Sequence, residues 1–202
     1  MAAASPARFW NRFADRYAAR SIKVPCRLRC DARRLRPTDR VLEIGCGTGS
    51  IAIRLAPHAG EWTATDFSPE MLRIARAKPA PKNLRSVLAD AGSAFDSGPF
   101  DAICAFQVLH LVEDLPGVLS RVHANLKPGG LLMSKTWCFA DMGLKLRGLF
   151  LVLHMVGLFP TVNALTKTAL REAVRDAGFE IVEERVYGAN PHGPYLVART
   201  PA

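Results

Sequence analysis

At 202 residues, of which 49% are apolar, the chain is long enough to bury the core of one domain. It has no low-complexity tract, no internal repeat and no apolar run of the roughly 20 residues that cross a bilayer, which argues against disordered, repeat and membrane-spanning proteins. The first 20 residues lack the apolar centre of a secretory signal. We therefore expect a single domain over 1–202 in a cytoplasmic protein.

The positive charge is concentrated at one end. Of a formal net charge of +9, residues 1–40 carry +8, from 11 Lys and Arg against three Asp, so the remainder is almost neutral. Such a basic arm attracts the phosphates of nucleic acid or of an anionic membrane surface, or it forms a solvated helix face. Both interpretations stay open.

The five cysteines do not form a metal motif. Their number is odd and they have no paired CxxC spacing, so we interpret them as reduced thiols. Cys26 and Cys30 are close in sequence, but no second pair of ligands follows them. We predict no metal site. The cysteines are Cys26, Cys30, Cys46, Cys104 and Cys138.

From residue 41 onward, strand and helix signals alternate. Ser68 has the character of an N-cap, with Pro69 at the first helical position. LKPGG, at 126–130, is typical of a turn. We expect four helices from residue 41 onward. The first follows the glycine cluster at 45–49, the second begins at Pro69, the third carries the apolar residues of 115–126, and the fourth covers 164–177. The expected strands are 41–44, 62–65, 84–88, 100–106, 131–137, 180–186 and 194–199.

Repeated strand-then-helix units predict a parallel sheet with helices on both faces. The last two strands are too close in sequence for a crossover, so we expect them to pair antiparallel. Ligands of such sheets lie beyond the carboxyl ends of the strands. Gly45, Asp66, Asp90 and Phe106 all fall at such ends.

The strongest motif is the glycine cluster that follows the first buried strand, in VLEIGCGTGS at 41–50. Glycines there allow a ligand to approach the backbone and allow positive φ angles. The nicotinamide fingerprint G-x-G-x-x-G/A does not fit, because Ser50 occupies its last small position. Instead the spacing is G-x-G-x-G, with Glu43 two positions before Gly45. A purely structural strand-to-helix turn is the alternative.

Two carboxylates follow at the next strand ends. Asp66 lies 17 residues after Gly49, a distance that accommodates one helix and one strand. A carboxylate at this place can accept hydrogen bonds from both hydroxyls of a ribose. Asp90 ends the following strand, where it can accept from an adenine amino group. Each alone is compatible with a cap or loop residue, but the combination on successive strand ends favours a nucleoside site.

Five segments carry a resemblance to a known family: VLEIGCGTGS, ATDFSPEML, LAD at 88–90, FDAICAFQVLHLVEDL and LKPGGLLMSKTW. In order and spacing they resemble the motifs of class I S-adenosylmethionine (SAM)-dependent methyltransferases, most of all the small-molecule, quinone-methyltransferase-like group. The similarity is close over 8–137. It implies a Rossmann-like α/β fold, with a seven-stranded, mostly parallel sheet, a reversed last strand and helices on both faces. It also implies SAM as the cofactor.

Carried over residue by residue, the resemblance implies that Gly45 and Gly47 face the methionine part of SAM, and Cys46 between them is also a candidate cofactor-binding residue. Glu43 would support its ammonium and Asp66 would hold the ribose. The remaining positions follow from the same resemblance: Phe67 and Met71 beside the adenine, Asp90 and the Ala91 backbone against the base, and Phe106 and Gln107 near the sulfonium.

The segment FWNRFADRYAAR resembles the lid helix of these enzymes, within an N-terminal lid and basic arm over 1–36. Phe9, Trp10, Phe13 and Tyr17 recur at helical spacing, so the stripe either covers the cofactor or faces the core. Tyr17 is our candidate lid residue, because its hydroxyl can reach the cofactor. Tyr17 and His110 are the candidate catalytic residues; for His110 the alternatives are a general base or a structural hydrogen bond.

The apolar insert over 138–163 is expected to lie over the acceptor site. Its segment 148–160 is 13 uncharged residues, which we interpret as either a buried or an interfacial helix. Either fits a small lipophilic acceptor, and a membrane-resident quinone or phospholipid would imply peripheral membrane contact. RNA, DNA and protein acceptors are disfavoured, because no NPPY-type tetrapeptide follows Phe106 and no RNA module is recognised. A non-catalytic partner protein is disfavoured by the intact motif.

Overall fold

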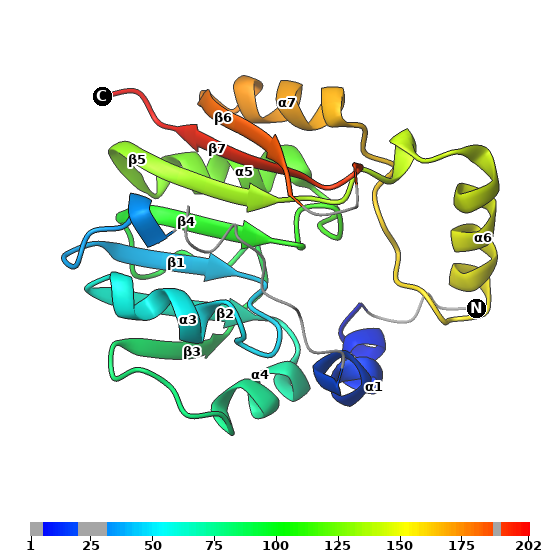
Figure 1. The fold of residues 1–202 in the computed structure, drawn as a ribbon, viewed down its shortest axis with the longest axis horizontal. Helices are drawn as coiled ribbons and strands as arrows, with labels where there is room; N and C mark the ends of the chain where they lie inside the picture. Colours follow the sequence, from blue (N-terminus) through cyan, green and yellow to red (C-terminus); the bar gives the residue numbers. More distant parts are fainter. Residues whose placement is uncertain (1–5, 20–31, 188–190) are drawn as a thin grey trace.

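The computed structural model describes residues 6–19, 32–187 and 191–202. The described residues contain a seven-stranded sheet in the order β3-β2-β1-β4-β5-β7-β6 (Figure 1). The strands are β1 (Arg40–Ile44), β2 (Glu61–Asp66), β3 (Leu84–Leu88), β4 (Phe100–Phe106), β5 (Leu126–Lys135), β6 (Glu180–Val186) and β7 (Pro194–Arg199). The helices are α1 (Pro6–Ala19), α3 (Ala52–Leu55), η1 (Ala56–His58), α4 (Pro69–Arg76), α5 (Leu115–Ala124), η2 (Phe139–Asp141), α6 (Leu144–Met155) and α7 (Lys167–Asp176).

The pairing of the strands confirms the predicted topology. β1 pairs parallel with β2 and with β4, β2 with β3, and β4 with β5. β7 runs antiparallel to both β5 and β6, so the last strand of the chain is the reversed one. The short connection between β6 and β7, part of which lies outside the described residues, is consistent with their antiparallel pairing.

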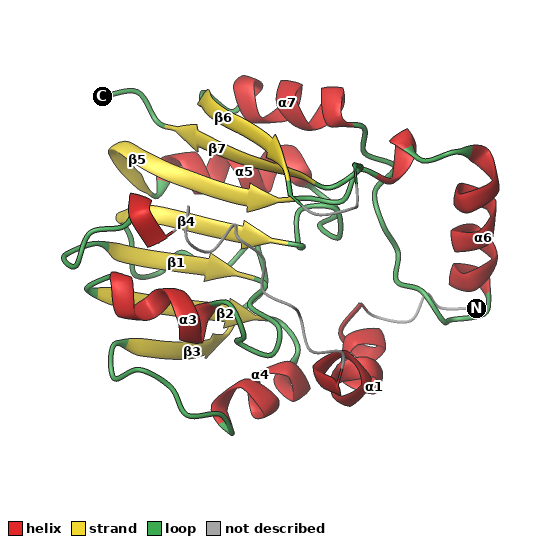
Figure 2. Ribbon diagram, in the orientation of Figure 1, coloured by secondary structure: helices red, strands yellow, loops and turns green. Residues whose placement is uncertain are grey.

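Helices cover both faces of the sheet (Figure 2). On one face, α5 and α7 pack with Leu42 and Ile103 in one apolar cluster. On the other, α3 and α4 pack with Val41 and Ala102 in a second cluster. Adjacent residues of one strand thus supply opposite cores, which explains why these strands are apolar without interruption.

Local sequence explains the start of α4. The Ser68 hydroxyl accepts a hydrogen bond from the Met71 amide at 3.2 Å, and Pro69 occupies the first turn. This confirms the predicted N-cap, which fixes the direction of the chain just after Asp66.

The prediction of a turn at LKPGG was wrong, because β5 begins at Leu126 and runs through this segment. Leu126 pairs with Phe100, and the register then shifts before Ala102 pairs with Leu131. The glycine and proline residues therefore form an irregularity within the strand rather than its boundary. Gly129, at φ +72°, supplies the conformation that this irregularity needs.

Candidate active site

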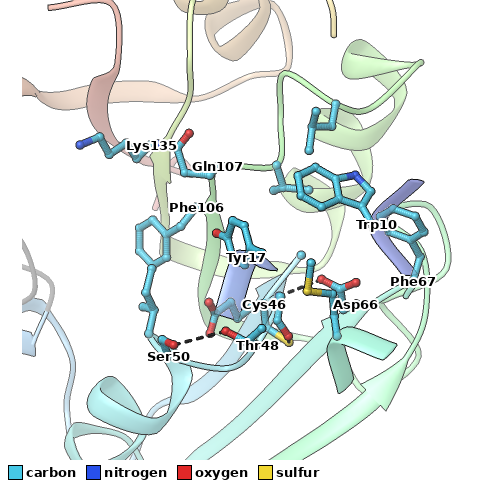
Figure 3. A pocket seen from close by; sticks show the side chains of 17 residues that line it. Trp10, Tyr17, Cys46, Thr48, Ser50, Asp66, Phe67, Phe106, Gln107 and Lys135 are labelled. Atoms are coloured by element: carbon cyan, nitrogen blue, oxygen red, sulfur yellow. Dashed lines mark hydrogen bonds between the residues drawn. The ribbon is translucent and has the colours of Figure 1, made fainter. Parts of the chain in front are cut away.

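A cavity of about 250 Å³ lies where β1, β2, β4 and β5 end, beside α1 (Figure 3). Ten of the predicted site residues line it, which brings together side chains from five separate segments. They are Tyr17, Glu43, Gly45, Cys46, Gly47, Asp66, Phe67, Met71, Phe106 and Gln107. Parallel strands end at one edge of a sheet, which is why residues so far apart in sequence meet here.

The glycine loop requires glycine for two different reasons. Gly45 has φ +68°, and a Cβ on it would lie 2.6 Å from Cγ2 of Val108, so both conformation and space exclude a side chain. Gly47 has φ +54° and its missing Cβ would lie 3.7 Å from the Tyr17 ring, an ordinary contact distance. At Gly47 only the backbone conformation demands glycine.

Asp66 connects this loop to the end of β2. One carboxylate oxygen accepts the Gly47 amide at 2.8 Å, and the other accepts the Ser68 amide at 2.9 Å. Burial raises the pKa of the Asp66 carboxyl, and the bonds from Ser68 and Gly47 oppose this rise. The Phe67 amide also lowers the pKa of Asp66, so three backbone amides act on a carboxylate with about four lone-pair sites, and acceptor capacity toward a ligand hydroxyl remains.

Glu43 forms part of the wall of the cavity although it belongs to a strand. It is 1% exposed, and Oε2 accepts a hydrogen bond from the Trp62 indole at 3.1 Å. The position of the Glu43 carboxylate is thus fixed by a side chain of the neighbouring strand β2. Glu43 and Asp66 together make this side of the cavity acidic, which favours a cationic ligand.

Helix α1 faces the glycine loop through Trp10 and Tyr17, which both line the cavity. Their spacing of seven residues puts them on one helix face, and their rings meet edge to face at 6.0 Å. Phe9 and Phe13 instead stack on each other at 4.6 Å. The predicted stripe is therefore divided: Tyr17 and Trp10 line the cavity, and the two phenylalanines do not.

Two polar contacts attach α1 to the body. The Ser68 hydroxyl donates to the Asn11 side chain at 2.7 Å, and Arg73 forms an exposed ion pair with Asp15 at 3.3 Å. The Ser68 contact is the stronger anchor, because an exposed ion pair contributes little. Ser68 thus caps α4 and holds α1 against the site.

Two groups at the cavity stay protonated at neutral pH. Burial, followed by the charges of Asp66 and Glu43, raises the pKa of the Tyr17 hydroxyl. Burial, with Glu43 next, raises the pKa of the Cys46 thiol well above its usual value. Tyr17 is therefore a hydrogen-bond donor toward a ligand, and Cys46 is no nucleophile.

Gln107 takes an unusual backbone conformation directly after β4. Its φ of +62° is the only positive value among the described non-glycine residues, and its amide donates to the Lys135 carbonyl at 2.7 Å. Strained backbone of this kind is concentrated at functional sites. The turn places Phe106, Gln107 and Val108 along one wall, beside Lys135.

Three predicted site residues do not line the cavity: Asp90, Ala91 and His110. One Asp90 oxygen accepts the amides of Gly92 and Ser93 at 2.7 and 2.9 Å, and the Gly92 bond chiefly lowers the pKa of the Asp90 carboxyl. Asp90 thus closes a local turn. Its contact with a base, and that of Ala91, stay predictions.

His110 is 5% exposed and does not line the cavity, although its neighbours in sequence Val108 and Leu111 do. Its ring lies 5.8 Å from that of Phe139, and Nδ1 has no hydrogen-bond partner among the described residues. Burial lowers the pKa of the imidazole to about 4, so the ring is neutral at physiological pH. A role for His110 as a general base stays a prediction.

Sequence reasoning missed the remaining lining residues, which are Thr48, Ser50, Ile51, Val108, Leu111 and Lys135, and it did not separate Trp10 from its neighbours. It also missed Lys78, whose ammonium donates to the Thr48 carbonyl at 2.6 Å and to the Ser50 hydroxyl at 3.2 Å. Through these two hydrogen bonds Lys78 holds the C-terminal part of the glycine loop in place. No local pattern marks it, because the contact joins segments 30 residues apart.

The insert over 138–163 contributes no residue to the cavity wall. Its helix α6 has no buried residue, so the alternative of a buried helix was wrong. Cys26 and Cys30, with part of the basic arm, lie outside the described residues.

A seven-stranded sheet with a reversed β7, a glycine loop after β1 and a carboxylate after β2 defines a Rossmann-like fold with a nucleoside site. The N-methyltransferase NodS of Bradyrhizobium japonicum, in complex with S-adenosyl-L-homocysteine, has this fold. It superposes with a TM-score of 0.70 at 20% identity, over 96% of this chain and 99% of that one. A family model described as a methyltransferase domain matches residues 9–184. The chain therefore belongs to this family, the SAM-dependent methyltransferases.

Two curated relatives are similar over shorter stretches. The bifunctional biotin biosynthesis protein BioCD of Bordetella avium is 35% identical over 127 residues, 61% of this chain and 26% of that protein. The ubiquinone biosynthesis O-methyltransferase of Xanthomonas axonopodis is 32% identical over 117 residues, 55% of this chain and 49% of that protein. The chain thus spans between a quarter and a half of the length of these relatives.

Proposed function

We propose that the protein transfers a methyl group from SAM to a small lipophilic acceptor. The observation that carries the proposal is the mixed lining of the cavity, which holds the carboxylates of Glu43 and Asp66 together with the apolar side chains of Trp10, Phe106 and Leu111. The carboxylates suit the cationic donor. The apolar side chains suit an acceptor that leaves water easily.

The residues at the acidic side fit SAM in their chemistry. Asp66 is a carboxylate that can accept from a ribose hydroxyl, and the amides of Gly47 and Ser68 fix its direction. Glu43 offers a buried carboxylate for the ammonium of the methionine part. Phe67 and Met71 provide apolar surface for the adenine. The glycine loop leaves the space that the methionine backbone would take.

When bound, SAM supplies an electrophilic methyl group on a sulfonium, a good leaving group for in-line displacement. The work of the chain is then to align the acceptor and to exclude water, effects worth up to about 7–11 kcal/mol in well-oriented reactions. Trp10 and Tyr17 cover the cavity, and the Gln107 turn holds Phe106 beside it. A base is needed only for an acceptor that begins protonated.

The chemistry of the apolar wall favours a quinol or another hydrophobic ring over a charged substrate. Acceptors of this class include the quinols that reside in a bilayer. The similarity to a ubiquinone biosynthesis O-methyltransferase supports this class. In our proposal helix α1, the described helix of the predicted lid segment, covers the site, and 138–163 lies on the acceptor side.

The test is a screen with radiolabelled SAM against quinol, phenol, phospholipid, amine and thiol acceptors. We expect transfer to a hydrophobic acceptor. The Leu111→Asn variant should raise its KM at least about tenfold, because a polar group then faces the apolar wall. Binding of S-adenosyl-L-homocysteine should be unchanged, which controls for the fold. Transfer only to hydrophilic acceptors, with a KM insensitive to Leu111, would contradict the proposal.

A further inference from the structure

Helix α6 presents an apolar surface that the body of the protein leaves exposed. Leu144 is 82% exposed, Leu151 60%, Val152 57% and Met155 77%. Leu146 and Leu149 are also exposed, at 46% and 52%, so apolar side chains surround most of the helix. The four most exposed large apolar residues of α6, which we call the α6 stripe, fall within about 100° of its circumference. Outside α6 and the turn after it, only Leu88, Val182 and Val186 are comparably exposed among large apolar side chains of the described residues.

The attachment of α6 fixes which face is free. The Phe150 ring packs against the rings of Trp137, Phe139 and Phe159 at 5.8, 5.4 and 4.6 Å. Phe150 therefore points toward the body, and the residues of the α6 stripe lie about 100–160° around the helix from it. Figure 1 shows α6 standing away from the sheet, on the side where the parallel strands end.

The charges around the stripe are positive. Lys145 and Arg147 lie in the first turn of α6, both exposed, and the helix contains no acidic residue. Helix α1, at the same end of the molecule (Figure 1), carries three arginines against one aspartate, Asp15. A cationic first turn is unfavourable for the helix dipole in water, whereas beside an anionic surface it is favourable.

We propose that α6 docks the protein on the surface of an anionic bilayer, with the α6 stripe inserted at the interface and Lys145 and Arg147 at the lipid phosphates. A helix of 12 residues is about 18 Å long and cannot cross a core of about 30 Å, so it lies in the plane of the membrane. None of the helices in the described ranges has the length and apolarity to span a bilayer.

Docking on the bilayer does not depend on the proposed function, whereas the delivery of a lipophilic acceptor to the cavity rests on it. Because α6 and the cavity lie at the same end of the sheet, a protein docked through α6 would have its cavity near the bilayer, where a lipophilic acceptor resides. The membrane contact can therefore be tested without any substrate, so the two proposals can fail separately.

The test is co-sedimentation of the full chain with vesicles of phosphatidylcholine alone and of an equal mixture with phosphatidylglycerol. The variant L151Q/M155Q removes two stripe residues that touch little in the folded protein, so its unfolding temperature should equal that of the wild type. We expect its partition coefficient on the mixed vesicles to fall at least about tenfold. The matched control is V182Q, because Val182 is 40% exposed on β6.

The salt dependence of vesicle binding should distinguish the electrostatic contribution from that of apolar insertion. Binding of the wild type should fall as salt rises, because screening weakens the attraction of Lys145 and Arg147. The K145E/R147E variant should lose binding to the mixed vesicles while its weak binding to neutral vesicles stays unchanged. Wild-type protein that stays in the supernatant with mixed vesicles at low salt would overturn the proposal. So would equal binding by L151Q/M155Q, or a stable dimer that this variant dissociates, which would make α6 a contact between two copies.

Discussion

His110 makes the stability of the protein depend on pH in a calculable way. The pKa of its imidazole falls from 6.5 to about 4 on burial, and Nδ1 finds no partner among the described residues. Because the pKa is lower in the folded protein, the imidazole is protonated in the unfolded chain and neutral in the folded protein at a pH between about 4 and 6.5. The contribution of His110 to stability is therefore complete above pH 6.5 and is lost as the pH falls through about 4. The full shift corresponds to about 3 kcal/mol.

The assay compares the free energy of unfolding in urea for wild type and His110→Phe. Phenylalanine keeps an aromatic ring beside Phe139, which lies 5.8 Å away, and it removes the titration. Between about pH 7.5 and pH 4.5 the wild type should lose about 2.5 kcal/mol more than the variant. Carboxylates titrate in both proteins, so the difference isolates His110. Parallel curves would show that His110 protonates freely in the folded protein, and would refute the burial argument.

The other predictions concern the loop and the lid. Gly45→Ala should lower the free energy of unfolding by about 2–4 kcal/mol, and adding Val108→Ala should restore the part due to overlap but not the part due to positive φ. Tyr17→Ala should weaken SAM binding by calorimetry whereas Phe13→Ala leaves it unchanged; equal effects would mean that α1 acts only as a whole. Lys78→Met should lower the free energy of unfolding by about 1–3 kcal/mol and also weaken SAM binding. A loss of stability with unchanged SAM binding would show that the Lys78 contact with the glycine loop does not affect the site.

Strand positions were predictable because each strand is bounded by local signals. The bounds predicted for 84–88, 100–106, 180–186 and 194–199 agree with the structure. The site residues on the glycine loop and at Asp66 were predictable for a related reason, since parallel strands must end at one edge. The LKPGG segment was misjudged because a strand can absorb glycine and proline by a shift of register, which depends on the neighbouring strand β4.

Long-range contacts set the limits of prediction. The 2.6 Å approach between Val108 and the missing Cβ of Gly45 joins two strand ends, and nothing local indicates it. The apolar composition of α6 could be read from the sequence, but its exposure could not, because burial depends on what the rest of the fold places beside it. Asp90 shows the use of one carboxylate oxygen in a local turn, through the amides of Gly92 and Ser93, and its contact with a base stays a prediction.

The central claim is that Asp66, held by the Gly47 and Ser68 amides, binds the ribose of SAM in this cavity. The most direct measurement is titration calorimetry of SAM and S-adenosyl-L-homocysteine with wild type and Asp66→Ala. We expect both ligands to bind the wild type at low-millimolar affinity or better. The variant should stay folded and bind about 1.5–3 kcal/mol more weakly, as for a lost hydrogen bond to a charged group. Unchanged binding in a folded Asp66→Ala variant, or heat with NAD and none with either ligand, would contradict the account.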